Sequence, residues 1–186
     1  MKILGVDPGT AIVGWGLIET AGRKIGSQIV PKVLACGIIS TNSGTPDANR
    51  LEIIFDSISD IMKREKPDVA AVEELFFFKN QKTVMTVSQS RGAIILAVKK
   101  SQTPLFEFTP LQVKQSITGY GRAEKKQVQE MIKVLLHLKE IPKPDDAADA
   151  LAIALCCAQS IKSEYRNPTR LADGSPRRKF ETNSKF

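Results

Sequence analysis

Three acidic residues stand in otherwise apolar stretches near the two ends of the chain. Asp7 follows the apolar run of KILGVDPGT at residues 2–10, and Asp146 and Asp149 lie within PDDAADALAIAL at residues 144–155. A carboxylate in apolar surroundings is destabilised by several kcal/mol unless a cation or hydrogen-bond donors compensate it. These residues therefore predict a bound cation, and a divalent metal ion suits them best.

A fourth acid, Glu73, ends the apolar run DVAAVE at residues 68–73. Ligands of open α/β sheets gather where strands end, so Asp7 and Glu73 are placed to converge. Carboxylates about 4 Å apart would repel by roughly 4 kcal/mol per pair at an effective dielectric constant of 20, so they need a hard cation. An all-oxygen set selects Mg²⁺, with Mn²⁺ as a plausible substitute, and two such ions about 3.5 to 4 Å apart suit phosphodiester hydrolysis.

Some of these residues also fit a purely structural role. Acids in the first turn of a helix stabilise its dipole, and this suffices for Asp145, which we expect to cap a helix. It explains Asp149 less well, because the alanines around it predict a face packed closely against the sheet that carries Asp7. Alternation along a strand does not choose between Glu73 and Glu74. The single histidine, His137, is expected near a helix end, where it would act as a solvated cap.

Strands and helices that would position these acids follow from the hydrophobic pattern. A helix is predicted over residues 45–66, because apolar residues from Leu51 to Met62 recur at steps of three and four. Gly14 and Gly16 mark a stretch of backbone that another element approaches closely. The remaining expected elements are strands at 2–7, 11–19, 30–40, 68–73 and 105–108 and helices at 81–101, 110–117, 123–137 and 146–161.

This element order predicts one α/β domain over residues 1–161, with a mixed five-stranded sheet, antiparallel in its first three strands, and helices on both faces. Residues 162–186 read as a polar, basic tail without an apolar pattern, which we expect to be disordered.

The charge balance points to a polyanionic partner. Lys and Arg number 27 against 20 Asp and Glu, a net charge of +7, although such a charge can also serve solubility alone. The three cysteines lack zinc-site spacing and are expected to be reduced thiols. With no signal peptide and no long apolar span, we expect a cytoplasmic protein without a membrane partner.

Basic residues are concentrated in one segment, residues 114–133, which contains a GYG break. They would form either a solvated helix face or a surface that contacts DNA phosphates, and we favour the phosphate contact. The residues are Lys114, Arg122, Lys125, Lys126 and Lys133.

Four motifs together resemble the RuvC family of Holliday-junction resolvases over nearly all of residues 1–160. They are GVDPGT, VEELFFFKN, TPLQVKQSITGYGRAEKKQVQ and DAADALAIA, in this order and spacing. The resemblance implies an RNase H-like fold, a homodimer, and paired symmetric Mg²⁺-dependent nicks across a four-way DNA junction during recombination and repair. It also implies a branch-migration motor of the RuvA and RuvB type as a partner.

The resemblance also assigns acidic residues by position. The family's four acidic ligands fall on Asp7, Glu73, Asp146 and Asp149, which selects Glu73 over Glu74. Some relatives carry histidine at the third position, whereas this chain has Asp146.

DNA contacts are assigned by the same resemblance. Lys114 and Lys125 match family lysines near the active site, whereas Arg122 and Lys126 are added from the basic segment itself. Phe76, the first of three consecutive phenylalanines, falls where an aromatic ring stacks on junction bases, a role worth about 1 to 3 kcal/mol per base. Arg91 and Gly92 match a family ArgGly pair, where we expect the glycine to permit close packing, including with a second subunit.

Two other functions fit part of the sequence. GVDPGT also resembles the first phosphate loop of actin-like ATPases and sugar kinases, but these need a second such loop and a much longer chain. A DNA-binding module without catalysis is the other alternative, and the presence of all four acids argues against it.

Overall fold

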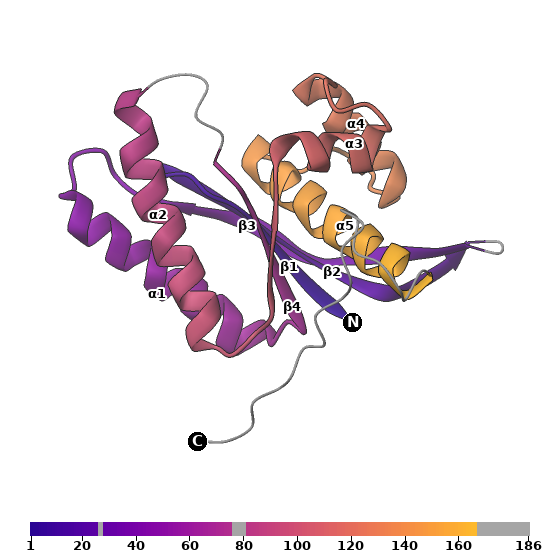
Figure 1. The fold of residues 1–186 in the computed structure, drawn as a ribbon, viewed down its shortest axis with the longest axis horizontal. Helices are drawn as coiled ribbons and strands as arrows, with labels where there is room; N and C mark the ends of the chain where they lie inside the picture. Colours follow the sequence, from indigo (N-terminus) through magenta and orange to yellow (C-terminus); the bar gives the residue numbers. More distant parts are fainter. Residues whose placement is uncertain (26–27, 76–80, 167–186) are drawn as a thin grey trace.

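Five strands form one mixed sheet in the order β3-β2-β1-β4-β5 (Figure 1). The computed structural model describes residues 1–25, 28–75 and 81–166. The strands are β1 (Lys2–Asp7), β2 (Ile12–Ile25), β3 (Gln28–Ser40), β4 (Val69–Glu73) and β5 (Leu105–Phe108). The helices are α1 (Asp47–Glu65), α2 (Gln81–Lys100), α3 (Pro110–Thr118), α4 (Lys125–Leu135) and α5 (Asp145–Arg166).

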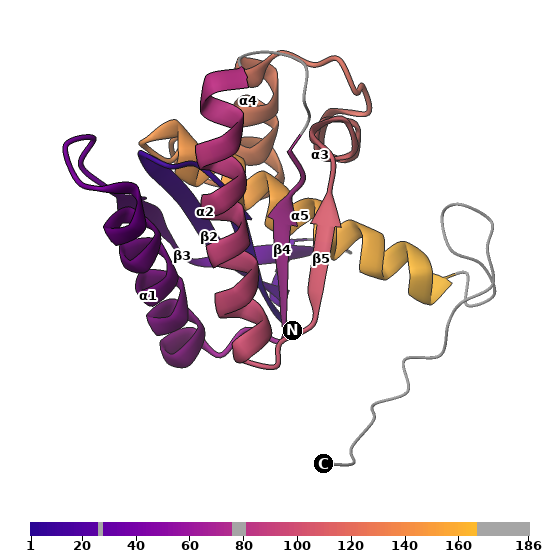
Figure 2. The same cartoon turned by 60° about the vertical axis from the view of Figure 1, so that its left-hand side comes forward.

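Strand directions match the mixed sheet that the sequence predicts. β1 pairs antiparallel with β2, and β2 pairs antiparallel with β3. β4 runs parallel to β1, and β5 runs parallel to β4 at the sheet's edge (Figure 2). The antiparallel first three strands and the five-stranded sheet are therefore confirmed.

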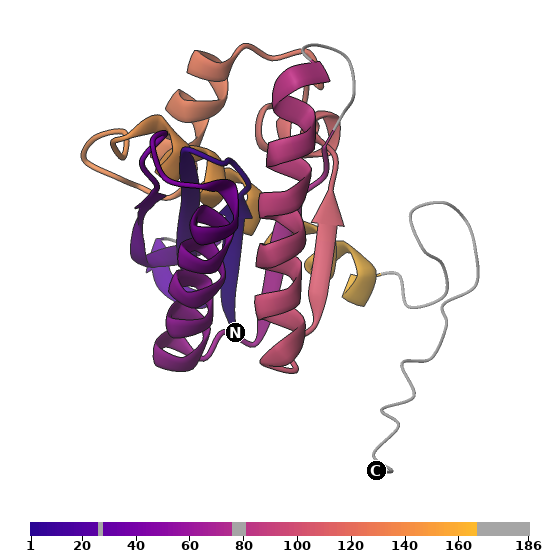
Figure 3. The ribbon, with the colours of Figure 1, turned by 90° about the vertical axis from the view of Figure 1, so that its left-hand side faces the viewer.

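Helices cover both faces of the sheet and enclose two apolar clusters. α1 and α2 lie side by side on one face (Figure 3), where the cluster includes Val6, Val72 and Ile58. α5 lies on the other face with α3 and α4 beside it, and this second cluster includes Leu151 and Phe108. Alternate residues of β1 and β4 therefore face opposite helical layers.

Several element boundaries differ from the prediction, most clearly those of β2, β3 and α5. β2 and β3 pair as far as Ile25 and Gln28, because the backbone ladder continues beyond the alternating apolar residues and through a bulge between Glu19 and Arg23. α5 continues to Arg166, five residues beyond the predicted end at residue 161. α5 also starts at Asp145, so this acid lies in the first turn and is not the N-cap residue.

In the described part of the chain, no helix is both long and apolar enough to cross a membrane. Its three cysteines are free thiols, as the sequence predicts. The fold brings together three structural ends: the carboxyl ends of the parallel strands β1 and β4 and the amino end of α5. These ends carry the four acids singled out in the sequence.

Candidate active site

Asp7 and Glu73 are the last residues of neighbouring parallel strands, β1 and β4. Val6 pairs with Val72 in the sheet, so the two acids follow directly on adjacent strands. Val6 and Val72 both pack against the α1 and α2 layer. Because side chains alternate along a strand, the two carboxylates point to the opposite face, where α5 lies.

α5 brings Asp146 and Asp149 to the same end of the sheet, because it packs directly against the backbone of glycine residues in β1 and β2. A Cβ atom on Gly14 of β2 would come closer than 3.0 Å to the backbone carbonyl oxygen of Asp146. A Cβ atom on Gly5 of β1 would meet the carbonyl oxygen of Ala150 in the same way. The close approach that the sequence predicts at Gly14 is therefore confirmed, and Gly5 adds a contact that the sequence patterns did not indicate.

Burial and mutual repulsion make the strand-end acids hard to ionise. Burial raises the pKa of Asp7 to about 8, and the charges of Glu73, Asp149 and Asp146 contribute to this rise in that order. Burial also raises the pKa of Glu73 to about 7, with a contribution from Asp149, while Lys114 and Lys125 act to lower it. The four acids are thus electrostatically coupled, and the nearby lysines offset their negative charge only in part.

Lys125 is a cation that contacts this cluster directly. Its Nζ lies 2.8 Å from Asp149 Oδ2 and 3.8 Å from Asp145 Oδ2. Burial raises the pKa of the Asp149 carboxyl, and the hydrogen bond from Lys125 partly offsets this effect. Lys125 is held in the first turn of α4 by a capping box in which Gln127 bonds the backbone of Glu124.

Two tests bear on a metal ion at this site. Among the residues that the structure describes, no group of three or more acidic, cysteine or histidine side chains is arranged so that it would hold an ion without rearrangement. The donor chemistry nevertheless fits a hard divalent cation, because all four side chains are carboxylates. The raised pKa values of Asp7 and Glu73 also indicate an uncompensated charge that such a cation would relieve.

Predicted DNA-contacting residues differ in their relation to this site. Lys114 on α3 and Lys125 on α4 act electrostatically on Glu73. Arg122 lies exposed on the loop before α4, and Lys126 lies exposed in the first turn of that helix. Both residues therefore lie at the protein surface, and Lys126 directly follows Lys125 in α4. Phe76 lies outside the described residues.

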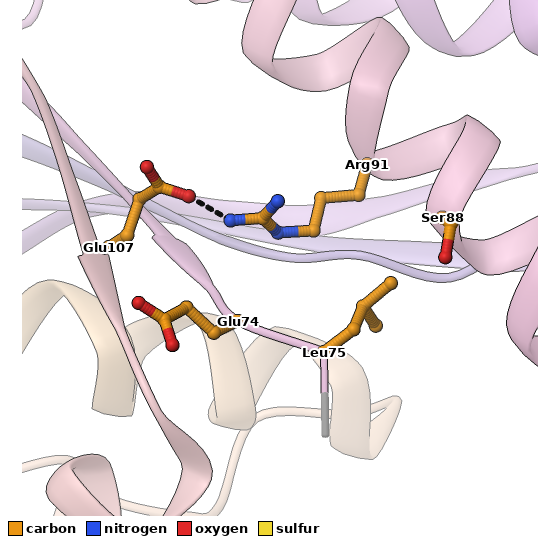
Figure 4. Close-up of a pocket in the computed structure, with 5 residues that line it drawn as sticks. All are labelled: Glu74, Leu75, Ser88, Arg91 and Glu107. Carbon is orange, nitrogen blue, oxygen red and sulfur yellow. Dashed lines mark hydrogen bonds and ion pairs between the residues drawn. The ribbon is translucent and has the colours of Figure 1, made fainter. Parts of the chain in front are cut away.

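One contact at this site does not follow from the sequence patterns. Arg91 of α2 donates from Nε to the backbone carbonyl oxygen of Glu73 at 3.0 Å and from Nη2 to the carboxylate of Glu107 (Figure 4). It lines an open pocket together with Glu74, Leu75 and Ser88. A Cβ on neighbouring Gly92 would meet nothing within 4 Å, so close packing at this glycine does not occur within the described chain. The match of Arg91 and Gly92 to a family ArgGly pair predicted close packing at the glycine, and it did not predict a bond from Arg91 to Glu73.

Comparisons with known proteins agree on one family. The family model described as crossover junction endodeoxyribonuclease RuvC matches residues 3–157. The crossover junction endodeoxyribonuclease RuvC of Pelotomaculum thermopropionicum is 51% identical over 166 residues, which cover 89% of this chain and 98% of the relative.

Solved structures agree with the sequence relatives. The Thermus thermophilus RuvC structure matches with a TM-score of 0.79 at 32% identity, covering 88% of this chain and 96% of that one. T. thermophilus RuvC in complex with Holliday junction substrate matches with a TM-score of 0.76 at 29% identity and the same coverage of both chains. The RNase H-like fold expected from the resemblance is confirmed by these matches. This chain belongs to the RuvC family of crossover junction endodeoxyribonucleases.

Proposed function

We propose that this protein resolves four-way DNA junctions by paired, symmetric, Mg²⁺-dependent phosphodiester hydrolysis during recombination and repair. The observation that carries the proposal is the convergence of half-buried Asp7 and Glu73 with Asp146 and Asp149 at one end of the sheet. The similarity to a RuvC protein solved with its Holliday junction substrate supports the same substrate here.

The four acids are proposed as ligands of two Mg²⁺ ions, with Mn²⁺ as a substitute. Held by these carboxylates, such ions would supply activation of a water molecule and stabilisation of the leaving oxygen of the scissile phosphate. Asp7 and Glu73 are fixed by β1 and β4, and Asp146 and Asp149 by α5. Three rigid elements thus hold the ligands, and such a site keeps its geometry better than one built on loops.

Basic residues beside the acids are proposed to hold the DNA backbone. Lys125 is 53% exposed although it contacts Asp149, so its ammonium group remains accessible to a phosphate. Lys114 lies close enough to Glu73 to act against the rise in its pKa, which puts a second positive charge beside the reacting phosphate. We assign Arg122 and Lys126 to the flanking backbone and Phe76 to stacking on junction bases.

A homodimer is proposed because its two-fold axis would present two equal active sites to opposed strands of one junction. α2 offers a suitable surface, since Met85 is 68% exposed and Leu96 is 54% exposed. These residues are eleven positions apart, about three helical turns, so they share one face with Gly92 between them. An apolar stripe with an open glycine suits a closely packed helix pair.

Domain organisation, cellular location and a further partner complete the proposal. Residues 1–161 are assigned to the catalytic domain and residues 162–186 to a polar basic tail, of which residues 162–166 continue α5. The protein works in the cytoplasm with a branch-migration motor of the RuvA and RuvB type. Family membership supports the cellular location and the motor partner, whereas the tail lies beyond the matched residues 3–157 and is assigned from its composition.

The decisive experiment is gel-resolved cleavage of immobile four-way junctions with varied core sequences, beside a matched linear duplex, in Mg²⁺ and in EDTA. We expect paired nicks that are confined to the junction and require Mg²⁺. The Asp7→Asn variant should bind the junction without cutting it, because basic side chains position the DNA independently of the acids. Binding without cleavage in every divalent metal would indicate a non-catalytic module, and equal cleavage of duplex would refute junction selectivity.

A further inference from the structure

An arginine on α2 bonds the backbone at the end of β4. Arg91 bonds the Glu73 carbonyl oxygen through Nε and the Glu107 carboxylate through Nη2 (Figure 4). Its side chain is only 19% exposed, so water competes weakly for these bonds. One planar guanidinium therefore joins α2, β4 and β5 at the residue that carries a proposed metal ligand.

The sheet's hydrogen-bond pattern shows where the Glu73 carbonyl points. The amides of Ala70 and Glu74 donate to carbonyl oxygens in and just before β5, at 2.9 and 2.8 Å. Peptide groups alternate in direction along a strand, so those of Glu73 turn the other way, toward β1. The carbonyl of Glu73 therefore depends on β1, or on a side chain, for a donor.

β1 cannot supply that donor. Val6 pairs with Val72, so Asp7 is the next residue opposite Glu73. In a parallel pair with this register, the Glu73 carbonyl would accept from the N–H of the residue that follows Asp7. That residue is Pro8, which has no N–H. The hydrogen-bond ladder between β1 and β4 is interrupted at Asp7 and Glu73. Arg91 Nε donates to the Glu73 carbonyl oxygen in place of the missing N–H group.

Arg91 reaches Glu73 from the side away from the acids. Glu107 pairs with Val72, and Val72 packs against the α1 and α2 layer, so Arg91 and Glu107 meet on that face. The Glu73 carboxylate faces α5 instead, as the alternation along β4 requires. Arg91 thus acts on the backbone of Glu73 and does not touch the reacting groups.

We propose that Arg91 is a positioning residue that orients Glu73 for metal binding by replacing the backbone donor lost at Pro8. The inference rests on the proposed function, because that function makes Glu73 a metal ligand. Without Arg91, the peptide following Glu73 would be free to turn, and the carboxylate would lose its fixed direction.

The test is direct titration of the full-length protein with Mn²⁺ by calorimetry without DNA, together with the Mg²⁺ dependence of junction cleavage. We expect Arg91→Met to weaken Mn²⁺ binding about 10-fold, as the loss of an orienting partner does at other metal sites, and to raise the Mg²⁺ concentration for half-maximal cleavage to a similar degree. Junction affinity in Ca²⁺ should stay unchanged, because the basic residues on α3 and α4 are untouched.

Glu107→Gln is the matched control, since it removes the ion pair and leaves the bond from Arg91 to the Glu73 carbonyl. We expect it to change Mn²⁺ affinity about 3-fold or less, because partly exposed ion pairs contribute little. Arg91→Lys replaces Arg91→Met if the latter does not fold, since it keeps the charge but loses the planar pair of donors. A folded Arg91 variant with wild-type Mn²⁺ affinity would overturn the proposal.

Glu73→Gln separates failure of this proposal from failure of the proposed function. If Glu73→Gln loses Mn²⁺ affinity and the Arg91 variants do not, only the positioning role is wrong. If Glu73→Gln itself keeps wild-type Mn²⁺ affinity and cleavage, the metal site assigned above is wrong, and the positioning role is overturned with it.

Discussion

Gly14 lies against the backbone of Asp146, so close that a Cβ atom on the glycine would come within 3.0 Å of the Asp146 carbonyl oxygen. Gly14 belongs to β2, which pairs with β1, and Gly14 stands opposite Asp7 in the register of the two strands. This contact therefore sets both the position of α5 on the sheet and the distance between Asp7 and Asp146, two of the proposed metal ligands.

Replacing Gly14 by alanine should separate these acids. The added methyl group would push α5 from β2, and a displacement near 1 Å can cost about 100-fold in rate. We expect Gly14→Ala to reduce junction cleavage by about 10- to 100-fold and the free energy of unfolding by about 1 to 3 kcal/mol. Junction affinity in Ca²⁺ should be preserved. Gly44→Ala is the control, since its Cβ would meet only Asn42 Oδ1 at 3.6 Å. Wild-type cleavage by Gly14→Ala would contradict this account.

Stability without metal should depend on pH through Asp7. The ordinary pKa of an aspartate is 3.8, whereas the pKa of Asp7 in the folded protein is about 8. Between these values the folded state binds a proton that the unfolded state has lost, so the free energy of unfolding falls as pH rises. Asparagine does not titrate, so the Asp7→Asn variant should not show this fall in the free energy of unfolding. In EDTA, we expect the variant to melt several degrees above wild type at pH 8, with a smaller difference at pH 5, since each kcal/mol shifts Tm by about 2 to 4 °C.

Two measurements check the cause of that difference. The exposed Asp56→Asn on α1 should show the wild-type pH profile, because its side chain lies outside the acidic cluster. Adding Mg²⁺ at pH 8 should stabilise wild type more than Asp7→Asn, since ligand binding to the folded state raises its stability. Parallel pH profiles of wild type and Asp7→Asn would disprove the assigned role of burial at Asp7.

Lys125 should contribute both to DNA binding and to catalysis. Its Nζ is 2.8 Å from Asp149 Oδ2, yet the side chain is 53% exposed. We expect Lys125→Gln to reduce the slope of log affinity against log salt by about 1, as for the loss of one phosphate contact, and to slow cleavage. Lys63→Gln on α1, across the sheet, should alter neither quantity. An unchanged salt slope in Lys125→Gln would rule out a phosphate contact.

Periodicity and strand ends were sufficient to predict most of this fold. The stripe on α1 is one example, since Ile54, Ile58, Ile61 and Met62 are buried as their spacing predicts. The spacing of apolar residues indicates which face of a helix or strand is buried, because residues on one face recur with the period of that element. The acids at the ends of β1 and β4 could be found for the same reason, as each ends a buried strand.

Contacts to the backbone could not be predicted in this way. The bond from Arg91 to the Glu73 carbonyl depends on the register of β1, β4 and β5 and on the absence of an N–H at Pro8. The burial of Arg50, which is 9% exposed on α1, is a second example. A charged residue in a helix reads as solvated until its partners are known, and Arg50 bonds a loop residue that periodicity does not place.

The side chain of Thr41 ties the segment that follows Asp7 to α1. Thr41 Oγ1 donates to the Thr10 carbonyl oxygen at 2.6 Å and accepts from Arg50 Nε at 2.9 Å. Thr41→Val keeps the shape of the side chain but leaves both partners unsatisfied, which costs about 1 to 3 kcal/mol for each buried group. Thr41→Ser retains the hydroxyl group and should lose less than half as much stability in urea unfolding. Because Thr10 is three residues from Asp7, we also expect Thr41→Val to weaken Mg²⁺-dependent cleavage more than Thr41→Ser does. Equal stability of the two variants would show that the hydroxyl group does not hold this loop.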